Sequence, residues 1–168
     1  MNTTPNRHRT QYLTHGALIA SLYVLLTWLA HQFGLDSGAI QIRLSEALTI
    51  LPCFTPAAIP GLAIGCLIAN ILSGCALWDV IFGTLATLLG AIGTRLLRKF
   101  KWLAPLPPIV ANILIVPYVL AYVYGAEGTI SFFMLTVGAG ELICCGVLGL
   151  MLYSLLDRYR RPLALELN

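Results

Sequence analysis

The sequence predicts an all-α membrane protein with six transmembrane helices, a short proline-bounded second helix, and both termini in the cytoplasm. Of its 168 residues, 58% are hydrophobic and only 10% are charged, and the mean hydropathy is +0.85. These values exclude an ordinary soluble protein. Apolar runs long enough to cross a bilayer alternate with polar segments. The basic residues gather beside these runs, where they report orientation and give no reason to expect nucleic acid as a partner.

The apolar runs divide the chain into one domain with two short tails. We expect helices, in chain order, over residues 12–33, 44–54, 57–73, 77–97, 107–124 and 130–156. The first run is longer than the apolar core of a secretory signal and has no clear cleavage site, so we expect it to remain. A single six-helix transmembrane domain is therefore predicted over 12–157, between cytoplasmic tails at 1–11 and 158–168.

Segment 39–60 is the stretch around which the other runs are arranged. It opens on polar side chains and then has three prolines four residues apart, in the order Gln41, Arg43, Ser45, Glu46, Pro52, Pro56 and Pro60. A soluble helix would not tolerate this proline series. At membrane depth, the backbone groups that proline frees must be satisfied by protein or by a cavity. We therefore predict a short recessed span that packs against other helices and not against lipid.

Three basic clusters predict the orientation of the helices. Arg7 and Arg9, the four basic residues within 95–101, and those within 158–161 all flank apolar runs. Because Lys and Arg are enriched in cytoplasmic loops, the three clusters should share the cytoplasmic side, and six crossings achieve this. If 44–73 were a single crossing, the cluster at 95–101 would lie outside, so five crossings are disfavoured.

Polar and aromatic side chains are concentrated toward the predicted outer side, which holds the connections 34–43, 74–78 and 125–129. The candidate ligand-binding residues are Gln41, Arg43, Glu46, Asn70, Trp78, Asp79, Tyr118, Tyr122 and, about three turns into the last helix, Glu141. Carboxylates, one guanidinium, amides and aromatic rings together suit a planar, N–H-rich small molecule, either neutral or cationic.

Glu141 is the sharpest of these candidates. An ionisable group deep in a membrane span is costly and usually faces a cavity or a partner. The neighbouring Gly138 and Gly140 would let another backbone or a ligand approach closely. The alternative is a structural carboxylate that is protonated or bonded to a neighbouring helix.

The other charged candidates also have structural alternatives. Arg43 and Glu46 are three residues apart, so they could form an ion pair on one helical face. Trp78 could be an interfacial belt residue. Asp79 could simply interact with the positive end of the helix dipole.

The amide and tyrosine residues are likewise open to two interpretations. Asn70 and Asn112 could bond across helices, and for Asn112 this structural role is the interpretation we adopt. Tyr118 and Tyr122 are four residues apart on one face, where they could form a stacking wall or part of the belt.

Small residues recur at four-residue spacing in the first helix. Gly16 with Ala20, and Ala17 with Ser21, would permit close helix packing, either within the chain or onto a separate membrane subunit. The full sequence contains no P-loop, no H-E-x-x-H and no G-x-S-x-G motif, so neither ATP hydrolysis nor another enzymatic activity is expected of it.

Two other functions are compatible with parts of the sequence. A solitary secondary transporter could use Glu141 and Asp79 as proton-coupling carboxylates. A small redox enzyme could use the vicinal pair Cys144 and Cys145, although the five cysteines contain no C-x-x-C and lie in apolar context, which is typical of small core residues.

Four blocks carry a resemblance to a known family: RLSEALTILP at 43–52, WDVIFGTLAT at 78–87, KWLAPLPPIVANILIV at 101–116 and VGAGELICCGVLG at 137–149. With them the chain, from about 14 to 159, resembles the QueT family, substrate-binding membrane subunits of energy-coupling factor (ECF) transporters that take up queuosine precursors. The resemblance implies a six-helix protein of the bacterial cell membrane that imports a 7-deazaguanine, such as the aminomethyl base, the nitrile base or queuine.

The resemblance also implies partners and residue roles. Two ABC-type ATPase subunits and a coupling membrane subunit would supply the energy, so ATP is used by the partners and no cofactor is expected in this chain. Helix 1 would dock on the coupling subunit through Gly16, Ala17, Ala20 and Ser21, although Gly16 and Ser21 depart from the family's alanine pattern. The loaded subunit would topple in the membrane to release its ligand inside.

In the site implied by the resemblance, Glu141 would bind the guanine-like edge. Asp79 or Glu46 would bind a cationic amine if the ligand carries one, and Asn70 or Gln41 would donate to the carbonyl oxygen. The ring would stack on Trp78, Tyr118 or Tyr122. The segment 34–42 would partly close the site.

Overall fold

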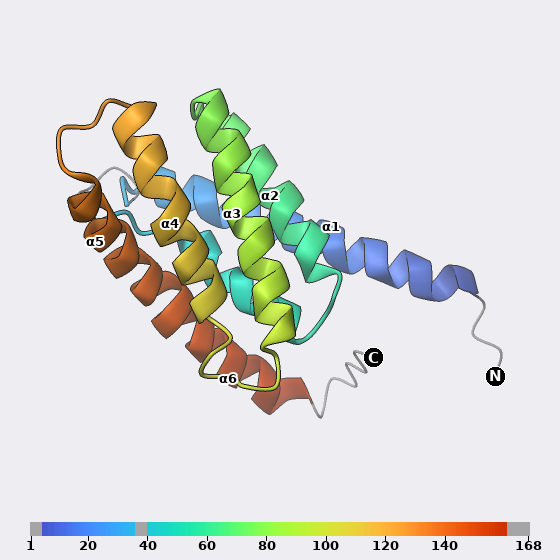
Figure 1. Ribbon diagram of the computed structural model, residues 1–168. Helices are drawn as coiled ribbons and strands as arrows, with labels where there is room; N and C mark the ends of the chain where they lie inside the picture. The colour runs from blue at the N-terminus through green and yellow to red at the C-terminus, as the bar shows by residue number, and fades with distance from the viewer. Residues whose placement is uncertain (1–4, 36–39, 161–168) are drawn as a thin grey trace.

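Every regular element is a helix within residues 5–35 and 40–160, the part of the chain that the computed structural model describes (Figure 1). The elements are α1 (Pro5–Gln32), the 3₁₀-helix η1 (Leu44–Cys53), α2 (Ala58–Leu72), α3 (Leu77–Leu96), α4 (Leu106–Tyr122), α5 (Ile130–Glu141), the π-helix η2 (Leu142–Leu148) and α6 (Gly149–Arg160). The predicted all-α class is confirmed. Residues 1–4 and 161–168 of the predicted tails, and 36–39 of the predicted outer loop, lie outside the described residues.

Two boundaries differ from the sequence-based expectation by more than two residues. Helix α1 begins at Pro5, earlier than the predicted start at residue 12, so part of the predicted N-terminal tail is helical. Proline is acceptable there because the first turn of a helix has no N–H partner to lose. The last predicted helix is one helical rod made of α5, η2 and α6, and it extends to Arg160.

The helices differ in how much of a bilayer they could cross. Three are long and apolar enough to span it: His8–Gln32, Leu77–Leu96 and Ile130–Tyr159. The others are apolar but shorter, with 10 residues in η1, 15 in α2 and 17 in α4, against the roughly 20 that a straight span needs. η1, α2, α3, α4 and the rod formed by α5, η2 and α6 alternate in direction (Figure 1). Six crossings and the cytoplasmic termini stay predictions.

The short helix η1 occupies the centre of the molecule. It contacts α1, α2, α3, α6 and η2, so it lies against protein, as its prolines predicted. Side chains satisfy the backbone carbonyls around Pro52: Arg95 Nη1 donates to Pro52 O at 3.0 Å, and Thr49 Oγ1 donates to Glu46 O at 2.6 Å. The segment can therefore break regular α-helical bonding without leaving these acceptors bare.

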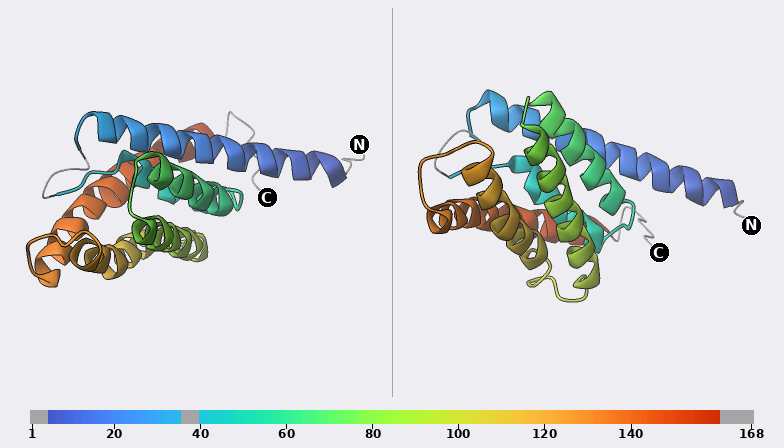
Figure 2. Two further views of the ribbon diagram at one scale, coloured as in Figure 1. Left: turned by 90° about the horizontal axis from the view of Figure 1, so that it is seen from above. Right: turned by 45° about the horizontal axis from the view of Figure 1, so that its top comes forward.

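Small residues bring α1 and α2 together. Figure 1 shows α1 crossing beside α2, and its N-terminal end extends beyond the other helices (Figure 2). A Cβ added at Gly61 would lie 2.7 Å from Gly16 O, and one at Gly65 would lie 3.0 Å from Ala20 Cα. Gly16 and Ala20 therefore serve packing within the chain. The second predicted pair, Ala17 and Ser21, is exposed.

Gly65→Ala should destabilise the protein. The new methyl group would lie 2.8 Å from Tyr23 Cβ and 3.0 Å from the Ala20 backbone, so the two helices must move apart. We expect a loss of about 1–3 kcal/mol, measured as a lower thermal unfolding midpoint of the purified protein in detergent.

Gly146→Ala is the matched control, because no heavy atom lies within 4 Å of its added Cβ. It should unfold at the wild-type temperature or slightly above it. Equal midpoints for Gly65→Ala and the wild type would contradict the packing described for α1 and α2.

Candidate functional site

Two buried carboxylates face each other in the interior. Glu46 of η1 is 2% exposed and Glu141, at the end of α5, is 7% exposed. One carboxylate oxygen of each, together with Cys145 Sγ, lies within 4.8 Å of the others. The π-helix η2 begins directly after Glu141 and contains Cys145. Such π-helical segments occur frequently at functional sites.

Both oxygens of Glu141 have donors. Asn112 Nδ2 of α4 donates to Oε1 at 2.8 Å, and Cys145 Sγ donates to Oε2 at 3.0 Å. The structure thus contains the bond to a neighbouring helix that was the structural alternative for Glu141, and Asn112 bonds across helices as the sequence predicted. Because a carboxylate offers about four lone-pair sites, Glu141 can still accept from a ligand.

Only one of the two carboxylate oxygens of Glu46 has a hydrogen-bond partner among the described residues. Its Oε1 accepts a hydrogen bond from Tyr23 Oη at 2.5 Å. Its Oε2 is buried and has no hydrogen-bond partner among the described residues. Leaving a buried acceptor unpaired costs about 1–3 kcal/mol. This oxygen therefore has unused hydrogen-bonding capacity among the described residues.

Of the two interpretations for Arg43 and Glu46, the structure does not show the ion pair within the described part of the chain: Glu46 Oε1 bonds to Tyr23, and Oε2 has no partner there. The charge of Arg43 acts first on Asp79 and more weakly on Glu46, and it also acts on Glu141. The reason is local structure, because Arg43 has extended backbone dihedral angles just before η1 and does not share a helical face with Glu46. One guanidinium is therefore shared among three carboxylates.

Asp79 and Asn70 approach each other around Gly83. A Cβ at Gly83 would lie 3.1 Å from Asn70 Nδ2 and 3.7 Å from Asp79 Oδ1. Asn70 also donates to Cys66 Sγ at 3.5 Å, on its own helix. These two predicted residues therefore lie together at the start of α3, where Gly83 leaves room for both.

Tyr124 connects two of the predicted outer loops. Its hydroxyl donates to Asp79 Oδ2 at 3.0 Å and accepts from the backbone N–H of Ala76 at 3.1 Å. Partial burial, with the negative charge of Asp79 as a smaller contribution, raises the pKa of Tyr124 to about 12. The phenol consequently stays protonated at neutral pH and remains a donor to Asp79.

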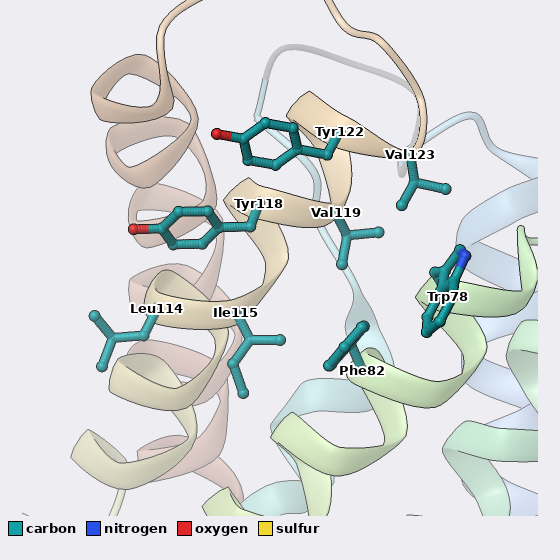
Figure 3. A pocket seen from close by; sticks show the side chains of 8 residues that line it. All are labelled: Trp78, Phe82, Leu114, Ile115, Tyr118, Val119, Tyr122 and Val123. Atoms are coloured by element: carbon teal, nitrogen blue, oxygen red, sulfur yellow. The ribbon is translucent and has the colours of Figure 1, made fainter.

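The predicted stacking residues lie elsewhere. Trp78, Tyr118 and Tyr122 line a cavity of about 680 Å³ between α3 and α4, together with Phe82, Leu114, Ile115, Val119 and Val123 (Figure 3). Their side chains are 56%, 45% and 77% exposed, respectively. Figure 3 shows the two tyrosine rings pointing away from Trp78. No carboxylate lines this cavity, so these three aromatic residues are not brought together with Glu46 and Glu141.

Gln41 lies beside α5. A Cβ at Gly140 would overlap the carbonyl oxygen of Gln41, so the absence of a side chain at Gly140 allows this close approach. The Gln41 residue also lines a small cavity of about 150 Å³, whose other lining residues are Leu120, Ala126, Phe132, Phe133, Thr136 and Val137.

Two residues of the site were not predicted as part of it. Cys145 was interpreted as a core residue, although its position four residues after Glu141 places both on one helical face and could have indicated the contact. Tyr23 lies in an apolar helix, and no spacing in the sequence links it to Glu46. The contact exists because α1 crosses η1 at this point.

The chain is similar to known transporters. A family model described as QueT transporter matches residues 13–158. The Queuosine precursor transporter QueT of Lactococcus lactis subsp. cremoris (strain MG1363) is 40% identical over 87 residues, which cover 51% of this chain and 50% of that protein. The aligned region thus spans about half the length of that relative. No solved structure matches.

Tyr23→Phe should destabilise the protein because it removes the donor to Glu46 Oε1 and leaves both carboxylate oxygens buried without partners. We expect a loss of about 1–3 kcal/mol, measured by thermal unfolding in detergent. Tyr12→Phe is the matched control, since Tyr12 Oη makes only an exposed 3.5 Å bond to Pro56 O. It should change stability by less than about 0.5 kcal/mol. Equal losses in the two variants would contradict the role given to Tyr23.

Proposed function

The chain belongs to the QueT transporter family, and from this premise we propose that it captures a queuosine precursor for uptake as the substrate-binding component of an ECF transporter. The ligand would be a 7-deazaguanine, such as the aminomethyl base, the nitrile base or queuine. Family membership and the apolar helices make the chain a multi-pass membrane protein, and we infer that it lies in a bacterial cell membrane. The observation that carries the proposed capture role is the close approach of the buried Glu46 and Glu141, together with a Glu46 oxygen that has no partner among the described residues.

The two carboxylates suit the hydrogen-bonding edge of a guanine-like base. Its ring N–H and exocyclic amine are parallel donors, and a carboxylate can accept both. We assign this edge to Glu141, whose orientation is maintained by Asn112 and Cys145. Glu46 would add an acceptor for a further N–H group. Asn70 or Gln41 would donate to the carbonyl oxygen of the base.

The ring of the ligand would not reach every predicted aromatic residue from this position. Trp78, Tyr118 and Tyr122 line the separate cavity between α3 and α4. Stacking on them would require the ring to lie in that cavity and not beside Glu141. We therefore base the proposed binding site on the carboxylates.

Energy would come from partner subunits. The sequence has no P-loop, so we propose that two ABC-type ATPases and a coupling membrane subunit drive the transport, and that this chain carries out no enzymatic step. Gly16 and Ala20 pack against α2. The exposed Ala17 and Ser21 are therefore the part of the predicted docking face that is accessible to the coupling subunit.

Calorimetric titration of the purified chain alone, in detergent, tests the proposed capture role. We expect tight binding of at least one of the three 7-deazaguanines without any ATPase present, and no binding of riboflavin. Glu141→Gln keeps the side-chain shape but loses the charge and one acceptor, so it should weaken binding about 10- to 100-fold.

Glu127→Gln makes the same chemical change at an exposed position in the connection between α4 and α5, and it should bind as the wild type does. If Glu141→Gln kept full affinity for every 7-deazaguanine, the assignment of Glu141 would be wrong.

The main alternative is a solitary proton-coupled transporter, which the close pair of Glu46 and Glu141 could support. We expect proteoliposomes that contain this chain alone to show no uptake under a pH gradient. Addition of the ATPases, the coupling subunit and ATP should start uptake of the bound precursor. Uptake driven by the pH gradient alone would favour the alternative.

A further inference from the structure

We propose that the connection between α3 and α4, residues 97–105, is a docking surface for the headgroups of anionic phospholipids. This inference goes beyond the proposed function, because it concerns the membrane that surrounds the chain and not the molecule that the chain captures. The connection combines basic side chains with exposed aromatic rings, directly beyond the end of a helix that is long enough to cross a bilayer.

The first argument is the position of this connection. It begins directly after Leu96, the last residue of α3, which is one of the three helices that are long and apolar enough to span a membrane. The 20 residues of α3 give it a length of about 30 Å, which is the thickness of the hydrocarbon core. Figure 1 shows the connection at one end of the molecule, beyond the last turn of α3 and the first turn of α4. Its side chains are therefore at the level of the lipid headgroups.

The second argument is the chemistry of the side chains that the connection exposes. They are Arg98, Lys99, Phe100, Lys101 and Trp102. Lys and Arg close to a membrane surface are attracted by anionic headgroups, and Trp is enriched where headgroups meet acyl chains. The ammonium group of Lys101 lies 4.9 Å from the centroid of the Trp102 ring, so charge and ring are presented together. This combination suits a lipid that has an anionic headgroup and an apolar tail.

The third argument is the separation of charge along α3 and α4. No acidic residue occurs between Asp79 and Glu127 in the sequence. Asp79 lies in the first turn of α3 and Glu127 follows the end of α4, so both acids are at the opposite end of this helix pair from the connection. Within the basic cluster, the charge of Arg98 acts unfavourably on that of Arg95. An anionic group bound at the connection would relieve this repulsion.

The fourth argument is the internal structure of the connection. Thr94 Oγ1 donates to Ala104 O at 2.9 Å, and both residues are fully buried. The backbone N–H groups of Leu103 and Ala104 donate to Phe100 O at 2.9 Å and 3.0 Å. The backbone is thus ordered by the protein itself, while the basic side chains point to the exterior. A surface that is already ordered loses little conformational entropy when it binds a partner.

Native mass spectrometry of the intact chain, released from detergent, tests this surface. The chain is titrated with phosphatidylglycerol or phosphatidylcholine of identical acyl chains, so that the two lipids differ in headgroup charge. We expect phosphatidylglycerol to bind the wild type at least about tenfold more tightly. In Arg98→Gln/Lys99→Gln this ratio should fall to about one. Arg9→Gln/Arg158→Gln removes the same charge from exposed positions on α1 and α6, and it should keep the wild-type ratio.

Equal affinity of the wild type for the two lipids would overturn this inference, whether or not the variants fold. Equal losses in the two double variants would also overturn it, because the attraction would then come from the charge of the whole protein. If Arg98→Gln/Lys99→Gln kept the lipid preference but no longer assembled with the coupling subunit, the connection would be a protein interface instead. Binding of 7-deazaguanines should match the wild type in both variants, so the proposed function is tested separately.

Discussion

The burial of Glu46 is the constraint on which the rest of the structure depends. A carboxylate in an apolar interior is stable only where donors or cations surround it. Two of its neighbours come from distant parts of the chain, Tyr23 from α1 and Cys145 from η2, and Arg43 lies three residues before it. The contacts of Glu46 therefore require η1 to lie at the centre of the protein, and they make that centre polar.

Backbone packing makes this arrangement possible. Gly65 lets α1 lie close enough to α2 for Tyr23 to face inward, and Gly140 lets the backbone at Gln41 lie against α5. Within the 3₁₀-helix η1, Arg95 Nη1 donates to the backbone carbonyl of Pro52. An apolar protein can thus hold an irregular polar segment at its centre, where side chains donate to the backbone carbonyls of Glu46 and Pro52.

The two buried carboxylates differ in how completely they are hydrogen-bonded. Glu141 has a donor on each oxygen, whereas one oxygen of Glu46 has no partner within residues 5–35 and 40–160. A protein under selection for stability alone would be expected to pair that oxygen or to replace the residue. In the function proposed for this member of the QueT transporter family, the ligand would supply the donor that this oxygen lacks.

The sequence by itself determined the helical class and most helix boundaries. It also singled out Glu46 and Glu141 as candidate ligand-binding residues. These features are local, since hydropathy, proline, glycine and charge mark where a span begins and ends, and an ionisable residue in an apolar run is conspicuous.

Only the tertiary structure decided which faces of the helices meet. A helix that is apolar on all sides does not show in its sequence which side faces inward. For this reason Tyr23 as the partner of Glu46, the shared guanidinium of Arg43, and the separation of Trp78 from the carboxylates emerged only when the packed helices were seen together.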